Sequence, residues 1–262
     1  MASDSKIERA ARIFLDAYRA HKPIAGLPEE VRPATLDEAY AIQAAYAEIC
    51  GKARVGYKVG AASAQSQALV AADGPFLGRL FEGTVFKSPA RIPRGLLFNT
   101  LAEAELGFVI GENLAPRSGG YSRDEIANHI ASVHPIVEIC DHRFVDWRSV
   151  GVLQLIADNA FYGAMVVGDA IEGWAECDLS ETHVAMSVGG ELRGEGRCRP
   201  VLGDPISGIA WVASELSRQG HTLEAGSLIA IGTWTGLHAV SPSQTVDADY
   251  GAFGRVAISF DA

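Results

Sequence analysis

Apolar residues recur at helical spacing over roughly the first 50 residues, which predicts amphipathic helices there. Two of these stretches begin with the form of a capping box, in which Ser or Thr is followed three residues later by Glu. They are Ser5-x-x-Glu8 and Thr35-x-x-Glu38. The segment between them is predicted to be a loop, because it contains Pro23, Gly26, Pro28 and Pro33. The N-terminal part of the chain therefore predicts a small helical lobe.

From Val55 onward the pattern changes to short apolar or alternating runs separated by Gly and Pro, which is typical of β-strands. The predicted strands are Val55–Val59, Gly83–Phe86, Leu101–Ile110, Pro135–Cys140, Gly163–Val167, His183–Val188, Ser227–Ile231 and Arg255–Phe260. The sequence Val188-Gly189-Gly190-Glu191 has the composition of a hairpin turn.

Two further helices interrupt the strands. One begins at Ser122, and the other has Asp204 as its N-cap, Pro205 as its first residue and Gly220 at its end. Strands outnumber crossover helices, so a doubly wound parallel sheet is disfavoured. The pattern predicts an α+β fold, in which the small helical lobe is followed by a mixed sheet or barrel-like roll.

Two acidic residues stand inside the apolar strand Leu101–Ile110. Glu103 and Glu105 are two positions apart, so both carboxylates point to the same face of the strand. Two like charges there repel each other and are costly to bury without compensation. A hard divalent cation supplies that compensation. The alternative is an ordinary solvated strand face that carries two acids.

A third acid strengthens the metal interpretation. Glu138 is the only charged residue in the predicted strand Pro135–Cys140, and a lone carboxylate among apolar residues is costly unless it is paired, protonated or metal-bound. If the two strands pair, three carboxylates fill half of the coordination positions of an octahedral metal ion, and the other positions are left for water and substrate. These carboxylates belong to Glu103, Glu105 and Glu138. The pattern predicts a site for Mg²⁺ or Mn²⁺.

Composition and charge narrow the class of protein. The 262 residues are 48% hydrophobic, with 28 Gly and 11 Pro, which indicates a globular protein rich in turns. The net charge of −10 argues against a nucleic-acid or anionic-membrane partner, and no apolar run reaches membrane-spanning length. The four cysteines lack CxxC spacing, and the N-terminus is polar, so no signal peptide is expected. We expect free thiols and a cytoplasmic location.

Several segments together carry a family resemblance. They are Gly56-Tyr57-Lys58-Val59-Gly60, Gly74-Pro75-Phe76-Leu77-Gly78, Ala102-Glu103-Ala104-Glu105-Leu106, Val137-Glu138-Ile139, Ala157-Asp158-Asn159-Ala160, Leu202-Gly203-Asp204-Pro205 and Ile231-Gly232-Thr233-Trp234-Thr235-Gly236. In their order and spacing, from roughly residue 6 to 260, the chain resembles the 2-keto-4-pentenoate hydratases and 4-oxalocrotonate decarboxylases of the fumarylacetoacetate hydrolase superfamily.

The resemblance implies a fold and a set of site residues. It implies a mixed β-roll of the fumarylacetoacetate hydrolase C-terminal type over residues 83–262, after an N-terminal lobe over residues 1–82, with one continuous domain as the alternative. It also implies a homo-oligomer. In such proteins the E-x-E pair and a third Glu bind Mg²⁺ or Mn²⁺, which matches the three glutamates, and the lysine matching Lys58 is the acid/base group.

Lys58 and three other residues are therefore candidates for chemistry or substrate binding. A desolvated lysine beside a metal would have a lowered pKa, which suits proton transfer; the alternative is an exposed strand lysine. Arg143 is a candidate for binding a substrate carboxylate, or it forms a structural ion pair. Asp158 and Thr233 are candidates for substrate contacts, or they are turn residues.

Two positions depart from the pattern of the hydratases. Phe76 stands where the hydratases often carry Asp, and this apolar residue favours the decarboxylases. The segment from Asp141 to Trp147, in contrast, looks more like that of the hydratases. Phe161 stands where relatives commonly carry Ser. Together Phe76 and Phe161 make the predicted pocket more apolar, which suggests a substrate tail that differs from the smallest dienoate.

The predicted activity is that of a metal-dependent lyase. The resemblance implies that it adds water to a small 2-hydroxy-2,4-dienoate, or its 2-oxo tautomer, to give a 4-hydroxy-2-oxo acid, as in meta-cleavage catabolism of aromatic compounds. One alternative is decarboxylation of a 2-oxo-dioic acid like 4-oxalocrotonate. Another is a non-catalytic scaffold that keeps the metal site and binds a partner. A serine hydrolase is disfavoured, because no G-x-S-x-G is present.

Overall fold

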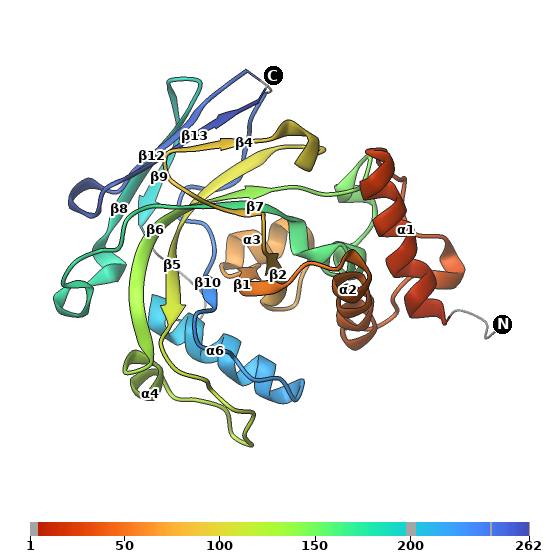
Figure 1. Ribbon diagram of the computed structural model, residues 1–262, viewed down its shortest axis with the longest axis horizontal. Helices are drawn as coiled ribbons and strands as arrows, with labels where there is room; N and C mark the ends of the chain where they lie inside the picture. Colours follow the sequence, from red (N-terminus) through yellow and green to blue (C-terminus); the bar gives the residue numbers. More distant parts are fainter. Residues whose placement is uncertain (1–4, 198–202, 242, 262) are drawn as a thin grey trace.

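Two mixed β-sheets and a group of N-terminal helices make up the fold (Figure 1). The computed structural model describes residues 5–197, 203–241 and 243–261. The α-helices are α1 (Lys6–Ala20), α2 (Leu36–Cys50), α3 (Ala64–Val70), α4 (Arg123–Ala127), α5 (Val152–Ala157) and α6 (Pro205–Arg218). Short 3₁₀ helices are η1 (Glu29–Val31), η2 (Arg94–Leu96), η3 (Trp147–Ser149), η4 (Asn159–Phe161), η5 (Trp174–Glu176), η6 (Leu179–Glu181) and η7 (Gly251–Phe253).

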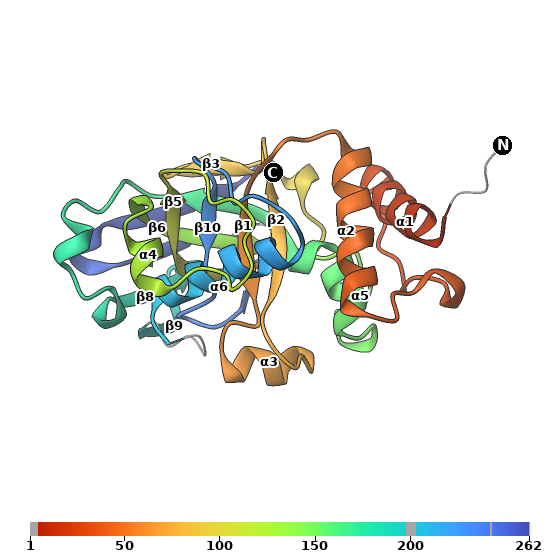
Figure 2. The ribbon, with the colours of Figure 1, turned by 90° about the horizontal axis from the view of Figure 1, so that it is seen from below.

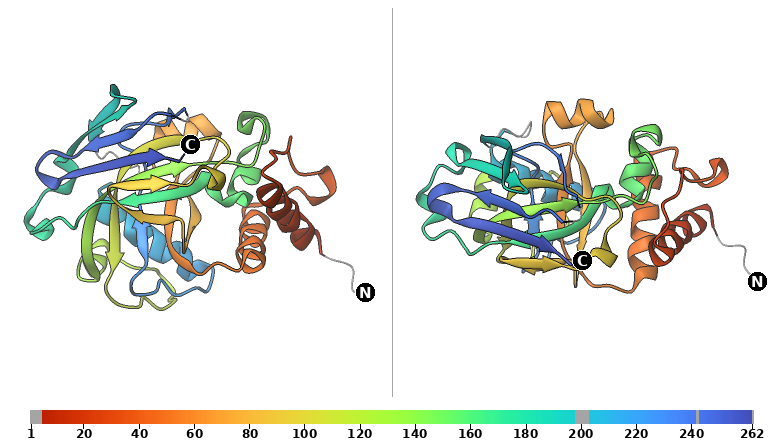
Figure 3. Two further views of the ribbon diagram at one scale, coloured as in Figure 1. Left: turned by 45° about the horizontal axis from the view of Figure 1, so that its top comes forward. Right: turned by 90° about the horizontal axis from the view of Figure 1, so that it is seen from above.

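The strands form two sheets that lie across each other (Figure 3). They are β1 (Arg54–Gly60), β2 (Phe76–Phe81), β3 (Val85–Lys87), β4 (Ala90–Ile92), β5 (Leu101–Ile110), β6 (Ile130–Cys140), β7 (Tyr162–Val167), β8 (His183–Val188), β9 (Glu191–Arg197), β10 (Leu228–Ala230), β11 (His238–Ala239), β12 (Val246–Asp249) and β13 (Arg255–Phe260). The larger sheet has the order β2-β1-β10-β5-β6-β7-β3, and β11 also pairs with β5; the smaller has the order β4-β13-β12-β8-β9. Most neighbours are antiparallel, but β1 with β10, β3 with β7 and β4 with β13 are parallel.

The N-terminal helices lie to one side of the sheets, as Figures 1 and 2 show. The hydroxyl of Ser5 caps α1, because it accepts a hydrogen bond from the amide of Glu8. Helix α2 is tied to β2 by buried polar side chains. Gln43 Nε2 donates to the carbonyls of Leu77 and Ile156, at 2.9 Å each, and the hydroxyl of Tyr40 accepts from the amide of Leu77 at 3.0 Å. The helical lobe is thus fixed to the edge of the larger sheet.

The fold class predicted from the sequence is confirmed. The chain begins with two capped helices and continues as mixed sheets, and strands β5, β8 and β13 have the predicted bounds. Helices α3 and α5 and strands β2, β4, β9, β11 and β12 were not predicted. They are short, and β2 is buried along its whole length, so it lacks the alternation that marks a strand with one exposed face.

The proposed boundary at residue 82 stays a prediction. Strands β1 and β2 belong to the first 82 residues, yet β1 pairs with β10 near the end of the chain. The N-terminal lobe thus contributes strands to the same sheet as the C-terminal part. Within the described ranges, none of the helices has the length and apolar character that crossing a bilayer requires.

Phe14 provides a test of how the helical lobe is held. Its ring is fully buried and packs edge-on against Phe144, with 5.8 Å between ring centroids. We expect Phe14→Ala to lower the free energy of unfolding by about 3–5 kcal/mol, because it removes a buried ring and leaves a cavity.

The control is Val145→Ala, because Val145 is 70% exposed. It should change stability by less than about 0.5 kcal/mol. Urea unfolding of both variants measures the difference. An equal, small loss in the two variants would show that Phe14 does not anchor the lobe.

Candidate metal and catalytic site

The pairing of β5 with β6 brings two glutamates face to face. The strands are antiparallel, and Glu103 lies directly opposite Glu138. This confirms the hypothesis that the two acid-bearing strands are neighbours. Both carboxylates are buried, which rules out a solvated strand face.

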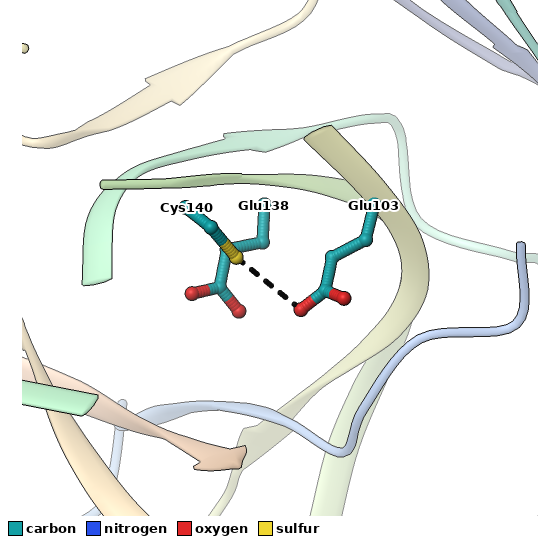
Figure 4. Close-up of side chains that lie close together, drawn as sticks. All are labelled: Glu103, Glu138 and Cys140. Atoms are coloured by element: carbon teal, nitrogen blue, oxygen red, sulfur yellow. Dashed lines mark hydrogen bonds between the residues drawn. The ribbon is translucent and has the colours of Figure 1, made fainter. Parts of the chain in front are cut away.

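A thiol completes the cluster. One ligand atom from each of Glu103, Glu138 and Cys140 lies within 4.8 Å of the others (Figure 4). Cys140 Sγ donates a hydrogen bond of 3.4 Å to Glu103 Oε1. Cys140 follows Glu138 by two positions on the same strand, so both side chains point to one face. That spacing is the sequence signal for Cys140, which was predicted only to be a free thiol.

Glu105 stands beside this cluster without joining it. Its Oε2 accepts a hydrogen bond of 2.7 Å from the amide of Gly232. Its Oε1 is buried and has no hydrogen-bond partner among the described residues. Of the three predicted metal ligands, Glu103 and Glu138 therefore lie together, whereas Glu105 is hydrogen-bonded to the segment after β10. Its assignment as a metal ligand stays a prediction.

Lys58 projects from β1 toward the same carboxylates. Its Nζ lies 3.2 Å from Glu138 Oε1, and the side chain is almost fully buried, which rules out an exposed strand lysine. The flanking glycines are needed for packing. A Cβ at Gly56 would lie 2.0 Å from the carbonyl oxygen of Leu228, and a Cβ at Gly60 would lie 2.3 Å from the ring of Phe76. The G-x-K-x-G pattern thus lets β10 and Phe76 close around the lysine.

Burial and mutual repulsion shape the charges of the site. Burial raises the pKa of Glu138 to about 7, although Lys58 opposes the shift. Burial, followed by repulsion from Glu103 and Glu138, raises the pKa of Glu105 well above its usual range. For Lys58, burial lowers the pKa, but Glu138 and the other acids raise it more, and the net direction is upward. These carboxylates outweigh desolvation. The lowered pKa was predicted for a lysine beside a bound metal ion, and it stays a prediction.

The residues fit a divalent cation. Both oxygens of Glu138 and one of Glu105 are buried without a hydrogen-bond donor in good geometry among the described residues, so these oxygens are available as ligands. Lys58 is the one cation that forms an ion pair with these glutamates in the described part of the chain. Carboxylate oxygens suit Mg²⁺ and Mn²⁺, whereas the thiol of Cys140 is a donor that Mg²⁺ does not favour.

A cavity of about 560 Å³ opens onto the cluster. Its lining includes Lys58, Glu103 and Cys140, and also Thr233 from the segment after β10. The hydroxyl of Thr233 also accepts hydrogen bonds from the amides of Gly236, at 3.0 Å, and Thr235, at 3.3 Å. Thr233 therefore combines the two predicted roles, because it shapes a turn and faces the cavity. Its contact with substrate stays a prediction.

Arg143 and Asp158 lie elsewhere. They form a buried ion pair with each other, and the amide of Arg143 donates to Asp158 Oδ2 at 2.8 Å. Arg143 also donates to the hydroxyl of Tyr46 at 3.1 Å. Neither residue lines the 560 Å³ cavity, and Arg143 lines a separate cavity of about 130 Å³. Their role in substrate binding stays a prediction, and these contacts favour the structural ion pair.

Comparison with known proteins identifies the family. Residues 40–260 match the model of the fumarylacetoacetate (FAA) hydrolase C-terminal domain, which is most of the chain. The chain belongs to the fumarylacetoacetate hydrolase family. The resemblance inferred from the sequence motifs is thereby confirmed, as is the mixed β-roll that it implied.

Relatives within the fumarylacetoacetate hydrolase family match over nearly the whole length. The 2-keto-4-pentenoate hydratase of Paraburkholderia xenovorans (strain LB400) is 31% identical over 97% of this chain and 95% of its own. The 2-hydroxyhexa-2,4-dienoate hydratase of Comamonas testosteroni is 26% identical over 99% of both chains. A solved structure of 4-oxalocrotonate decarboxylase from Pseudomonas putida G7, complexed with magnesium and adipate, superposes with a TM-score of 0.90 at 24% identity, covering 100% of this chain and 99% of the other.

Metal binding predicts a gain in thermal stability that depends on Glu103. At about 100 times its dissociation constant, Mg²⁺ or Mn²⁺ should raise the melting temperature by about 5–10 °C relative to chelator. Glu103→Gln should abolish most of this rise while keeping the Lys58–Glu138 ion pair. Glu112→Gln is the control, because Glu112 is exposed, and its rise should equal that of the wild type. A full rise in Glu103→Gln would show that the ion binds elsewhere.

The raised pKa of Glu138 predicts a pH dependence of metal binding. The cation binds the carboxylate, so below a pKa of about 7 protons compete with it, and above that value they do not. Metal binding should be about tenfold weaker at pH 6 than at pH 8 if one proton is displaced. Titration calorimetry in two buffers of different ionisation enthalpy measures both the affinity and the protons released. Equal affinity at the two pH values would contradict the assignment of Glu138.

Proposed function

We propose that this protein is a metal-dependent hydro-lyase that adds water to a small 2-hydroxy-2,4-dienoate and gives a 4-hydroxy-2-oxo acid. The observation that carries the proposal is that Lys58 and Glu103 line a cavity of about 560 Å³, with Glu138 beside both of them. The full-length similarity to hydratases of the same family supports the choice of substrate.

Glu103 and Glu138 would hold Mg²⁺ or Mn²⁺, with Glu105 as a further oxygen donor. When bound, a divalent cation supplies Lewis-acid stabilisation of negative charge on the substrate's carboxylate and 2-oxo oxygens. The solved decarboxylase structure that is complexed with magnesium supports a divalent ion as the cofactor. Burial of the glutamates keeps bulk water from competing for these oxygens.

Lys58 would move the protons of the reaction. The dienol loses its hydroxyl proton and gains a proton at carbon 5, which gives a conjugated 2-oxo-enoate. Water then adds its oxygen to carbon 4 and a proton to carbon 3. Lys58 lines the cavity and its Nζ lies beside Glu138, where it can hold the proton that moves in these steps. Thr233 would contact the substrate from the opposite segment.

Decarboxylation is the second candidate. The similarity in fold to 4-oxalocrotonate decarboxylase and the presence of Phe76 in the cavity favour it. The same residues would then stabilise the negative charge that develops as CO₂ leaves a 2-oxo-dioic acid.

We further propose a cytoplasmic homo-oligomer whose partner is this small acid, with no nucleic acid or membrane partner. The acidic charge and the family support these assignments.

A direct assay separates the candidates. The protein is incubated with Mg²⁺ and a freshly generated 2-hydroxydienoate, and the dienol absorbance is followed with and without chelator. Metal-dependent loss with a 4-hydroxy-2-oxo acid as product supports the hydratase. Release of CO₂ from the dicarboxylate instead would support the decarboxylase. If neither acid is turned over in a metal-dependent way, both proposals are overturned, and the non-catalytic metal-binding scaffold is the remaining alternative.

Lys58→Ala should lower kcat by about 10²–10⁴-fold, the range typical of a lost general acid/base. The thermal shift with Mg²⁺ should persist, because the carboxylates remain. Lys87→Ala is the matched control, since Lys87 is mostly exposed and lies outside the cavity lining, and it should keep full turnover. Full turnover by Lys58→Ala would exclude the lysine as the proton carrier.

A further inference from the structure

The cavity is larger than the smallest dienoate needs. A five-carbon 2-hydroxydienoate has eight heavy atoms, which fill roughly 240 Å³ even at the ~30 Å³ that a water molecule occupies in the liquid. The cavity holds about 560 Å³. With the carboxylate end at Lys58 and Glu103, more than half of the space lies beyond the reacting carbons.

Bulky apolar side chains form one part of the wall of this cavity, and polar side chains form another. The aromatic residues and the two aliphatic residues of α3 are Leu69, Val70, Phe76, Trp147, Phe161 and Trp234, whereas Ser63, Gln65, Ser66, His183, Glu195 and Arg197 are polar. The rings of Trp147 and Phe161 pack edge-to-face, with 5.1 Å between centroids, and the ring of Phe76 is fixed against the backbone of Gly60. These contacts give the wall a defined shape.

Helix α3 forms part of this wall. None of its residues is buried, and Leu69 is 50% exposed although it lines the cavity. Figure 2 shows α3 projecting beyond the sheets, away from the other helices. An apolar side chain that lines the cavity and is half exposed gains burial when an apolar ligand fills the space.

The cationic side chains of the described lining are already paired. Lys58 contacts Glu138, and Arg197 forms an ion pair with Glu181. The ring of His183 lies 3.7 Å from a carboxylate oxygen of Glu195. A second carboxylate at the far end of a substrate would therefore meet acidic groups and no unpaired cation among these residues.

We propose that the preferred substrate carries a bulky, uncharged, apolar tail of about aryl size on carbon 5, bound between α3 and the aromatic wall. This specificity rests on the proposed function, because it takes the metal and Lys58 as the anchor of the 2-oxo acid end. Leu69, Phe76 and Phe161 are the residues that determine it.

Binding of saturated acids tests the tail separately from the chemistry. The probes are 2-oxopentanoate, 2-oxo-5-phenylpentanoate and 2-oxohexanedioate, which share the 2-oxo acid end and cannot add water. Their affinities for the wild type are measured by calorimetry in the presence of Mg²⁺. We expect the phenyl acid to bind about 10- to 100-fold more tightly than 2-oxopentanoate, and the dioate no more tightly. Equal binding of the phenyl acid, or tightest binding of the dioate, overturns the inference.

A pair of variants locates the tail. Leu69→Ala should lower the preference for the phenyl acid over 2-oxopentanoate at least about threefold, because it removes apolar surface from the wall. Leu192→Ala, an exposed leucine outside the cavity lining, should leave that preference unchanged. An unchanged preference in Leu69→Ala would show that α3 does not contribute to binding of the tail.

Turnover of the matching dienoates distinguishes the two proposals. If the phenyl acid binds best but no dienoate loses its absorbance, the proposed function fails and the tail assignment stands. If the unsubstituted dienoate is turned over and the phenyl acids neither bind nor react better, the function stands and the tail assignment fails.

Discussion

The burial of negative charge between two paired strands is the constraint on which the site depends. Glu103 and Glu138 face each other across β5 and β6, and Glu105 is buried on the same strand face as Glu103. Lys58 offsets only part of this charge. Such an arrangement is costly to fold unless a cation or protons neutralise it. The raised pKa of Glu138 and the unsatisfied oxygens are two consequences of this single cost.

The surrounding fold holds these groups in place. Gly56 allows β10 to approach the strand of Lys58, and the amide of Gly232, just after β10, fixes Glu105. The buried pair of Arg143 and Asp158 joins the helical lobe to the end of the sheet through Tyr46. The lobe thus packs against the sheet that carries the site, and residues of α3 line the cavity.

Much of the fold and the main acids were predictable from the sequence, because local patterns encode them. The spacing of Glu103 and Glu105 fixed their shared face, and the isolated Glu138 marked a second buried acid. Contacts between distant segments were less accessible. The amide of Gly232 that binds Glu105, and the partner of Arg143, depend on tertiary packing that no local pattern reports. The direction of the Lys58 pKa shift also depends on tertiary packing, since it is set by how many carboxylates surround the lysine.

Helix α3 has a consequence for how such an enzyme can diversify. Since none of its seven residues is buried, substitutions there cost little folding free energy. Natural variation can therefore accumulate in this helix without disturbing the buried acids, which tolerate almost no change. Enzymes that descend from one ancestor can therefore acquire new substrate specificities through changes in a surface helix alone.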